Sequence, residues 1–149
     1  MPARDTDPLT GFMFALDAGG KVQGYFTEIS GLGSETEVIE HKIVDGSGRD
    51  LVQKIPGRLK FTDVTLKRGV TKTIDMWDWR KKVEDGDIVG ARTNASITMF
   101  DQSLTPVAKW DLINAWPSKI SGPQMQADST AYAIEEMTLV FESMAREKM

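Results

Sequence analysis

The stretch that decides the fold is KWDLINAWPSKISGP, residues Lys109–Pro123. Its side chains alternate between two faces, with Trp110, Leu112, Asn114 and Trp116 on one side and Lys109, Asp111, Ile113 and Ala115 on the other. Pro117 has no amide hydrogen for a strand ladder, so we expect the strand to end there or to lie at a sheet edge. Apolar residues on both sides indicate that one face meets the protein's own core and the other meets something else.

Composition limits the class of protein. The 149 residues fit one domain spanning residues 1–149, and the net charge of −4 argues against a nucleic-acid-binding surface, which needs an excess of basic residues. There is no cysteine, and the first residues, MPARDTDPLTGF, lack the apolar core of a signal peptide. No run approaches the roughly 20 apolar residues of a membrane span. We therefore expect synthesis in the cytoplasm and no stable membrane insertion.

Most of the chain has the two-residue period of β-strands. A first hairpin is predicted from Phe12–Leu16 and Lys21–Ser30, turning at Ala18-Gly19-Gly20. Further strands are predicted at Glu35–Val44, Arg58–Lys67, Ile88–Phe100, Pro106–Trp116 and Ser129–Met144, with a turn at Asp101–Ser103 and polar loops at Asp45–Gly57 and Ser118–Asp128.

The period changes to that of a helix in Thr71–Glu84. Met76, Trp79 and Val83 recur at helical spacing, and Thr71 or Thr73 is the expected N-cap. We expect this to be the only helix. Many antiparallel strands with one helix predict a mainly β fold, an antiparallel β-barrel or sandwich with one α-helix across it.

Residues for catalysis are scarce. His41 is the single histidine, lies between Glu40 and Lys42 in a predicted strand, and has no second histidine or cysteine with which to build a metal site. The segment Asp45–Asp50 lacks the Gly-Lys-Ser/Thr of a phosphate loop and the closing Glu of a calcium loop, so a flexible loop is the better interpretation. We predict no enzyme activity, no catalytic or metal-binding residues and no cofactor.

Surplus apolar surface is the remaining signal. The predicted strands Glu35–Val44, Arg58–Lys67 and Pro106–Trp116 carry apolar residues on both faces. One face of each can fill the domain's own core. Self-association is the simplest cover for the other face, and a closed ring also removes exposed strand edges.

Four segments resemble the tail-tube family of contractile phage tails and contractile injection systems, which is similar in fold to the haemolysin-coregulated tube protein of type VI secretion. They are Tyr25–His41 (YFTEISGLGSETEVIEH), Lys54–Gly69 (KIPGRLKFTDVTLKRG), Met76–Trp79 (MWDW) and Lys109–Glu142. Together they extend the resemblance from about Phe12 to Met144, nearly the whole chain.

This resemblance implies a structural subunit that forms six-membered rings, which stack into a hollow inner tube. Its implied partners are further copies of itself, a contractile sheath protein, baseplate and tube-cap proteins, and an effector or DNA as cargo in the lumen. Sheath contraction would drive the tube through a target envelope. The implied location is a bacterial cytoplasm for synthesis, followed by assembly into a virion tail or an injection particle. The side with Trp110 and Trp116 would then pack into the core near Trp77 and Trp79, and the side with Lys109, Asp111 and Ile113 would face the lumen or a neighbouring subunit.

The loop Asp45–Gly57 resembles the extended arm that the family uses between rings. It is too long for a simple turn and contains apolar residues that a free loop does not need. The residues predicted for the contact between rings are Arg49, Asp50, Leu51, Val52, Lys54 and Ile55.

Two alternatives to this interpretation stay open from the sequence. The first is a type VI-like secreted tube that carries effectors. The second is a small-molecule-binding β-barrel or enzyme, which the lack of convergent polar or metal-ligating residues counts against.

Overall fold

The computed structural model describes residue 11, residues 13–123 and residues 133–148. Its elements, in chain order, are β1 (Met13–Asp17), β2 (Gln23–Phe26), β3 (Glu28–Ser30), β4 (Ser34–Val44), β5 (Asp50–Phe61), β6 (Val64–Gly69), α1 (Asp75–Glu84), α2 (Ile88–Ala91), β7 (Thr93–Phe100), β8 (Pro106–Ser121), β9 (Ile134–Val140) and β10 (Ser143–Glu147). The predicted class, mainly β with antiparallel strands, is confirmed.

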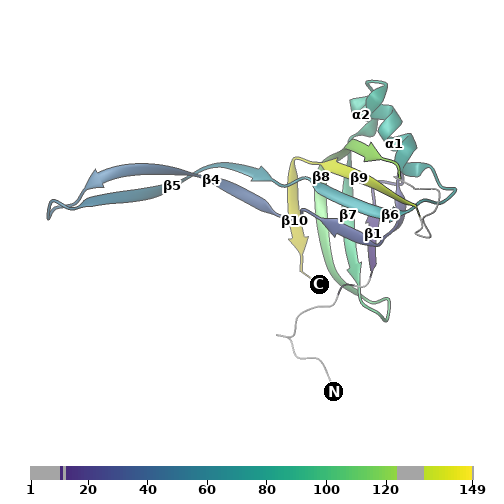
Figure 1. Cartoon of the computed structure of the whole chain (residues 1–149), viewed down its shortest axis with the longest axis horizontal. Helices are drawn as coiled ribbons and strands as arrows, with labels where there is room; N and C mark the ends of the chain where they lie inside the picture. The colour runs from purple at the N-terminus through teal and green to yellow at the C-terminus, as the bar shows by residue number, and fades with distance from the viewer. Residues whose placement is uncertain (1–10, 12, 124–132, 149) are drawn as a thin grey trace, which may run out of the picture.

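Two parts make up the molecule, which we call the body and the arm (Figure 1). The body is an eight-stranded antiparallel sheet in the order β2-β1-β7-β8-β9-β6-β3, with β10 also paired to β8. Because β8 pairs with β7 and β10 along its first part and with β9 along its last part, the sheet folds over itself into two layers. The arm is the two-stranded hairpin of β4 and β5, which projects from the side of the body.

Strand β8 is longer than predicted and changes faces. We expected Leu112, Asn114 and Trp116 to share a side, but the buried residues are Ala108 and Leu112 before Asn114, and Ala115 and Pro117 after it. Asn114 adopts a left-handed conformation with φ of 54°, which reverses the alternation of the strand. Its backbone amide donates to the Asn94 side chain at 3.2 Å, which helps to hold this turn in place.

Pro117 lies inside β8 and does not end it. It stands opposite Leu139 of β9, next to an irregularity in the register between Pro117 and Lys119. Proline is tolerated at such irregular positions because one ladder hydrogen bond is already missing there. The predicted polar loop from Ser118 therefore begins only after Ser121, and its residues 124–128 lie outside the described residues.

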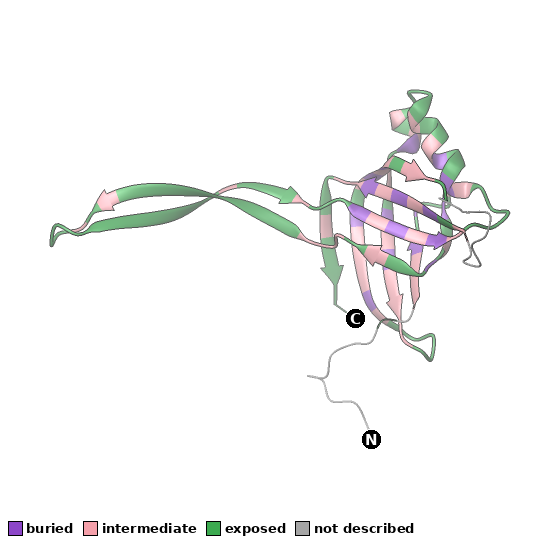
Figure 2. Ribbon diagram, viewed as in Figure 1, coloured by how far each residue is buried: buried purple, intermediate pink, exposed green. Residues whose placement is uncertain are grey.

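The core lies between the two layers of the body and is almost entirely aliphatic and aromatic (Figure 2). On β6, buried and half-buried residues alternate strictly, as expected for a strand with one face on a core. The fully buried side chains of largest volume include Trp79, Phe26, Leu16, Leu66, Ile97, Leu112, Met137 and Leu139.

The helical region differs from the prediction. Helix α1 starts at Asp75 with Ile74 as its N-cap, so neither Thr71 nor Thr73 caps it, and a second helix, α2, replaces the start of the strand predicted from Ile88. The Asp87 carboxylate accepts a hydrogen bond from the Gly90 amide at 2.9 Å, which favours this extra turn. Trp79 is 1% exposed, as predicted for a core residue, whereas Trp77 is 39% exposed.

The remaining boundaries also shift. The predicted return strand Lys21–Ser30 is split into β2 and β3, which pair with β1 and β6 respectively and so belong to different layers. The predicted strand Ser129–Met144 is split at residues 141–142 into β9 and β10. Phe12 and residues 129–132 of these predictions lie outside the described residues. Among the helices that the structure describes, none has the length and apolarity needed to cross a bilayer.

Candidate functional site

The arm is a regular antiparallel ribbon. Its register runs from Ser34 opposite Phe61 at the base to Val44 opposite Asp50 at the tip, with one irregularity between Thr36 and Val38. At about 3.3 Å per residue, strands of this length reach on the order of 35–40 Å. Among the described strands, β4 and β5 pair only with each other.

The tip of the arm is a five-residue turn, Asp45–Arg49. One carboxylate oxygen of Asp45 accepts hydrogen bonds from the amides of Ser47 and Arg49, each at 2.9 Å, and from the Ser47 hydroxyl at 2.8 Å. The bond from the Arg49 amide, followed by that from the Ser47 hydroxyl, lowers the pKa of Asp45 below its ordinary value. The aspartate that suggested a phosphate or calcium loop therefore serves to shape its own turn.

The predicted loop Asp45–Gly57 is wrong as a description of structure, because only Asp45–Arg49 is a turn and the chain from Asp50 onward is strand β5. Proline and glycine at Pro56-Gly57 suggested a break. They are accommodated because they lie beside the register irregularity, and because a ribbon of two strands leaves half of its amides facing solvent. The strand predicted from Arg58 thus begins earlier and ends at Phe61, and β6 starts separately at Val64.

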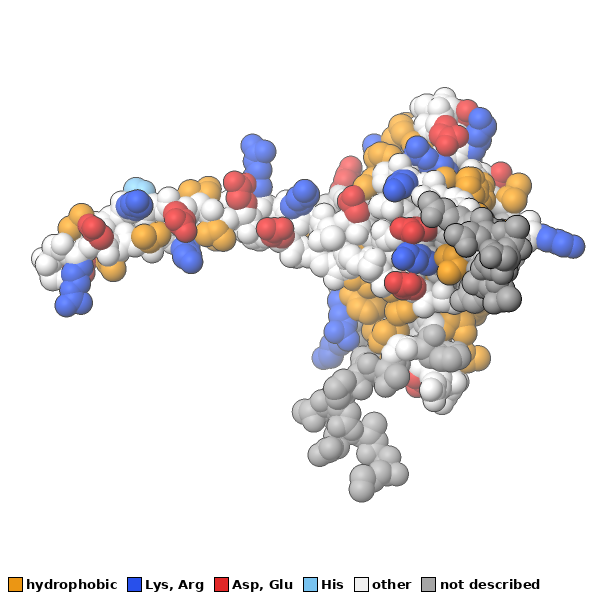
Figure 3. Space-filling view, in the orientation of Figure 1, with side chains coloured by type: hydrophobic (Ala, Val, Ile, Leu, Met, Phe, Trp, Pro, Cys, Tyr) orange, Lys and Arg blue, Asp and Glu red, His pale blue; other side chains and the backbone are white. Residues whose placement is uncertain are grey.

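Most of the arm is exposed (Figure 2). Its exposed hydrophobic residues include Val38, Ile39, Val44, Leu51, Val52, Ile55 and Leu59. Figure 3 shows hydrophobic side chains interspersed with acidic and basic ones along the arm. An isolated two-stranded hairpin is only marginally stable in water, so such a ribbon benefits from a cover that the other described residues do not provide.

The two faces of the arm differ in charge. Residues directly opposite in an antiparallel pair share a face, and successive residues alternate. What we call the uncharged face consists of Ile39, His41, Ile43, Leu51, Gln53 and Ile55. What we call the charged face consists of Val38, Glu40, Lys42, Val44, Asp50, Val52, Lys54 and Pro56.

The six residues predicted for the contact between rings therefore do not form one cluster. Arg49 lies in the turn, Leu51 and Ile55 lie on the uncharged face, and Asp50, Val52 and Lys54 lie on the charged face. The residues predicted for this contact include none on β4, although Glu35–Val44 was predicted as a strand with apolar residues on both faces, which was the signal that could have found them.

The connection between the body and the arm contains glycine. Gly31, between β3 and β4, has a φ of 91°, and a Cβ atom there would collide with the carbonyl oxygen of Asp63. At the base of the arm, the amide of Thr62, which follows β5, donates to the carbonyl of Gly33, which precedes β4, at 3.0 Å. These contacts fix where both strands of the arm leave the body.

A buried ion-pair network holds α1 against the body. Arg68 of β6 donates from Nε to Glu135 of β9 at 2.9 Å and from Nη2 to Asp75 at the start of α1. Trp77 Nε1 donates to the other Glu135 oxygen at 2.9 Å. Although burial lowers the pKa of Arg68, the hydrogen bonds to Asp75 and Glu135 raise it above its ordinary value. Each charge in this network has a partner, so the network serves structure.

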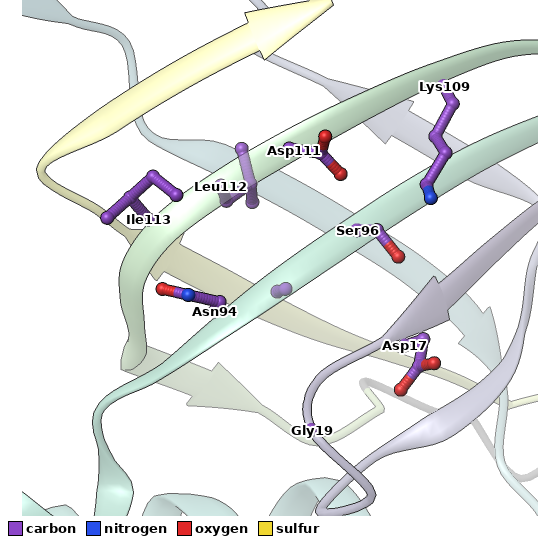
Figure 4. A pocket seen from close by; sticks show the side chains of 9 residues that line it. Asp17, Gly19, Asn94, Ser96, Lys109, Asp111, Leu112 and Ile113 are labelled. Atoms are coloured by element: carbon purple, nitrogen blue, oxygen red, sulfur yellow. The ribbon is translucent and has the colours of Figure 1, made fainter. Parts of the chain in front are cut away.

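The surface of the body has one hollow with several polar side chains, shown in Figure 4. It measures about 440 Å³, is open to solvent, and collects Asp17 from β1, Ser96 from β7 and Asp111 from β8. Beside it, a hydrogen bond shared with Asp111 raises the pKa of Glu147, whose carboxylate also lies 3.6 Å from Lys109 Nζ. An open polar hollow on a sheet differs from the enclosed, mostly apolar pocket that binds small ligands.

Metal ligands do not converge in the part of the chain that the structure describes, since no group of three or more His, Asp and Glu residues there could hold an ion. His41 lies on the arm among aliphatic neighbours and opposite Gln53. The predicted interpretation of His41 as a strand residue is confirmed.

The protein consists of a small antiparallel body and a long exposed arm. The arm is its most distinctive surface, and it is of a kind that suits contact with other molecules. The model of the T4-like virus tail tube protein gp19 family matches residues 10–145, so the chain belongs to that family. The family predicted from the four sequence segments is confirmed. No curated protein matches the sequence significantly.

Solved structures share the fold. A chain of an extracellular contractile injection system, in the PVC sheath-tube complex in its extended state, has 23% identity and a TM-score of 0.75, with 97% of this chain and 95% of that chain covered. A chain of the anti-feeding prophage cap has 23% identity and a TM-score of 0.75, with coverages of 100% and 97%. Hcp1 from Flavobacterium johnsoniae has 14% identity and a TM-score of 0.56, with coverages of 91% and 94%.

Proposed function

We propose that this tail-tube protein builds the inner tube of a contractile tail or extracellular injection particle, as six-membered rings that stack into a hollow cylinder. The observation that carries the proposal is the arm, whose two strands pair, among the described strands, only with each other and expose aliphatic residues on both faces. A contact of this kind is useful in an assembly that repeats, because every subunit then supplies one arm and covers another. The role is structural and not enzymatic.

The arm makes the contact between subunits of successive rings in this proposal. Leu51, Val52 and Ile55 are 44–51% exposed in the single chain. Burial against a neighbour contributes on the order of 1–2 kcal/mol for each such side chain, and a ring repeats the contact in every subunit. Arg49, Asp50 and Lys54 set the register of the contact through their charges, which contributes more to specificity than to affinity.

The partners follow from the same proposal. They are a contractile sheath protein around the tube, baseplate and cap proteins at its ends, and an effector or DNA in the lumen. Support comes from the neighbours of similar fold, which were solved as a sheath-tube complex, a tube-terminating cap and a baseplate. The net charge of −4 on every subunit favours passage of acidic cargo, because like charges keep such cargo from adhering to the wall. Synthesis in a bacterial cytoplasm precedes assembly into the particle.

The contractile-particle branch is favoured over a type VI-like secreted tube by fold similarity. TM-scores reach 0.75 against a chain of the PVC sheath-tube complex and 0.60 against a type six secretion system protein. The small-molecule-binding barrel has less support, since the described hollow on the body is open and polar.

The experiment is assembly of the purified full chain, alone and with the baseplate proteins of the same particle, followed by negative-stain microscopy and sedimentation. We expect rings and tubes. The double variant Leu51→Asp with Val52→Ser places a charge and a polar group on the two faces of the arm, and we expect it to stay folded and stop elongating. A strict 16.5 kDa monomer under all these conditions would overturn the proposal.

A matched control lies on the body. Val70→Ser changes a residue that is 45% exposed, close to the 44% of Leu51, but it lies outside the arm. We expect this variant to form tubes of normal length. Equal loss of assembly in both variants would show that the arm has no special role, and loss of folding in the arm variant would show that Leu51 and Val52 support the subunit itself.

A further inference from the structure

Apolar residues are exposed on both faces of the arm, but the two faces differ chemically. The uncharged face carries four aliphatic side chains, Ile39, Ile43, Leu51 and Ile55, around the central cross-strand pair His41–Gln53. The charged face carries Glu40 opposite Lys54, with Lys42 and then Asp50 farther toward the tip. Of the ladder residues 38–44 and 50–56, every one with a formal charge at neutral pH lies on this second face.

Removal of water affects these faces differently. Burying the uncharged face removes mostly aliphatic surface from water, which is favourable, and leaves only the imidazole and the amide to be hydrogen-bonded. Burying the charged face requires desolvation of four ions, and the attraction between such ions often fails to offset that cost. A partner therefore gains more by covering the uncharged face, while the charged face remains in water or at the rim of the contact.

The charge distribution favours a second copy of this chain as the occupant. Residues 34–61 contain five acidic and five basic residues, so the arm has no net charge, and the net charge of −4 resides entirely in the remainder of the chain. A neutral arm can approach an acidic copy of the same chain without repulsion. Identical subunits that repel each other elsewhere need such a neutral contact element in order to associate.

We propose that the uncharged face is the face of the arm that is buried on a neighbouring copy. The inference rests on the proposed tube function and specifies which face makes the contact. His41 and Gln53, at the centre of this face, are the polar groups that the neighbouring copy has to hydrogen-bond.

Face-specific variants of the full chain test the proposal. Ile39→Ser with Ile55→Ser removes a cross-strand pair from the uncharged face, where these residues are 50% and 44% exposed. Val38→Ser with Val44→Ser removes apolar groups of 57% and 66% exposure from the charged face, at positions outside the predicted contact residues. Circular dichroism and thermal unfolding check folding, and sedimentation gives the concentration at which half of the protein assembles.

We expect the uncharged-face variant to require at least about tenfold more protein for assembly, while the charged-face variant stays within about threefold of the unmodified chain. The reverse order, or equal effects, overturns the face assignment but leaves the tube function standing if the unmodified chain forms tubes. Failure of the unmodified chain to assemble overturns the tube function itself. An uncharged-face variant that does not fold contradicts the inference, because it shows that the face supports the subunit.

Discussion

The body and the arm are made of the same kind of antiparallel strand, but they place their apolar residues differently. Leu66 on β6 of the body is 0% exposed, whereas Leu59 on β5 of the arm is 59% exposed. Both belong to strands whose sequences mix apolar and charged residues. What differs is the number of layers: the body has a second layer facing β6, and the arm has none within the chain. Alternation therefore shows that a strand has two faces, but does not show that a face is covered.

The body and the arm each contain a turn with the same hydrogen-bonding pattern. At the tip of the arm, the Asp45 carboxylate accepts from the amides of Ser47 and Arg49, and in the body Asp101 accepts from those of Ser103 and Thr105. The fourth position has a positive φ in both, with Gly48 at 83° in the arm and Leu104 at 60° in the body. Only the arm places the residue type that prefers this conformation there.

The largest expected difference concerns ion pairs. Arg68→Met leaves Glu135, which is 2% exposed, as a buried carboxylate without its cation, and should lower the free energy of unfolding by about 3–5 kcal/mol. Lys54→Met on the arm, where Lys54 stands opposite Glu40 in solvent, should change it by less than about 1 kcal/mol. Urea denaturation followed by tryptophan fluorescence measures both. A loss below about 1 kcal/mol for Arg68→Met would mean that the network is not needed for stability.

The second largest difference is expected when one leucine side chain is truncated in each region. Leu66→Ala creates a cavity in the closed core and should cost about 2–5 kcal/mol. Leu59→Ala removes a side chain that is mostly in water, so about 0.5 kcal/mol or less is expected from the monomer. Thermal unfolding of dilute protein, at which no assembly occurs, compares the two directly. Similar losses would indicate that the arm is packed against the body in solution.

Exchange of the turn residues should have a smaller effect. Leu104→Gly relieves a left-handed leucine and should stabilise the body by up to about 1 kcal/mol, partly offset by the greater freedom of glycine in the unfolded chain. Gly48→Leu introduces the same strain at the arm tip, with no atom within 4 Å of the added Cβ, and should loosen the turn locally. Amide hydrogen exchange at the two turns distinguishes a local from a global change. Stabilisation by Gly48→Leu would contradict this comparison.

The smallest effect is expected from acid at the arm tip. The pKa of Asp45 is lowered in the folded arm, so its contribution is present above the unfolded pKa and disappears as the pH falls through the lower, folded value. Between about pH 5 and pH 2, the amide resonances of Ser47 and Arg49 should shift as their hydrogen bonds to the carboxylate weaken. Asp45→Asn is the control, in which these resonances should not titrate. A titration that persists in this variant would assign the shift to another group.

The sequence predicted much of the body because local signals there agree with its packing. The alternation of Met137 and Leu139, the helical spacing of Met76 and Trp79, and the hairpin at Gly19-Gly20 all recur in the structure. Predictions failed where a backbone conformation depended on a distant partner. Asn114 reverses β8 because Asn94, twenty residues away, holds its amide, and α2 forms where Trp79 Nε1 donates to the Ala91 carbonyl at 2.6 Å.

The contact site stays a prediction, and the structure changes the form of the segment that carries it. Leu51, Val52 and Ile55 were selected as apolar residues without a purpose in a loop, and they lie on the exposed arm. Their division between two faces could not be predicted, because it depends on the pairing of β5 with β4 and on the position of the turn. A one-residue shift of that register would move every side chain of one strand to the other face.

By itself, the sequence determined that the protein is mainly β, that it belongs among tail tubes, and that it has more apolar strand surface than one core can cover. Those properties follow from residue types and their period along the chain. Only the tertiary structure decided that β8 changes faces at Asn114, that Arg68 is neutralised by Glu135 and Asp75, and that the surplus surface is concentrated on an arm with one charged and one uncharged face. The physical reason is that strand register and layer packing arise from contacts between residues far apart in the chain, which no local pattern specifies.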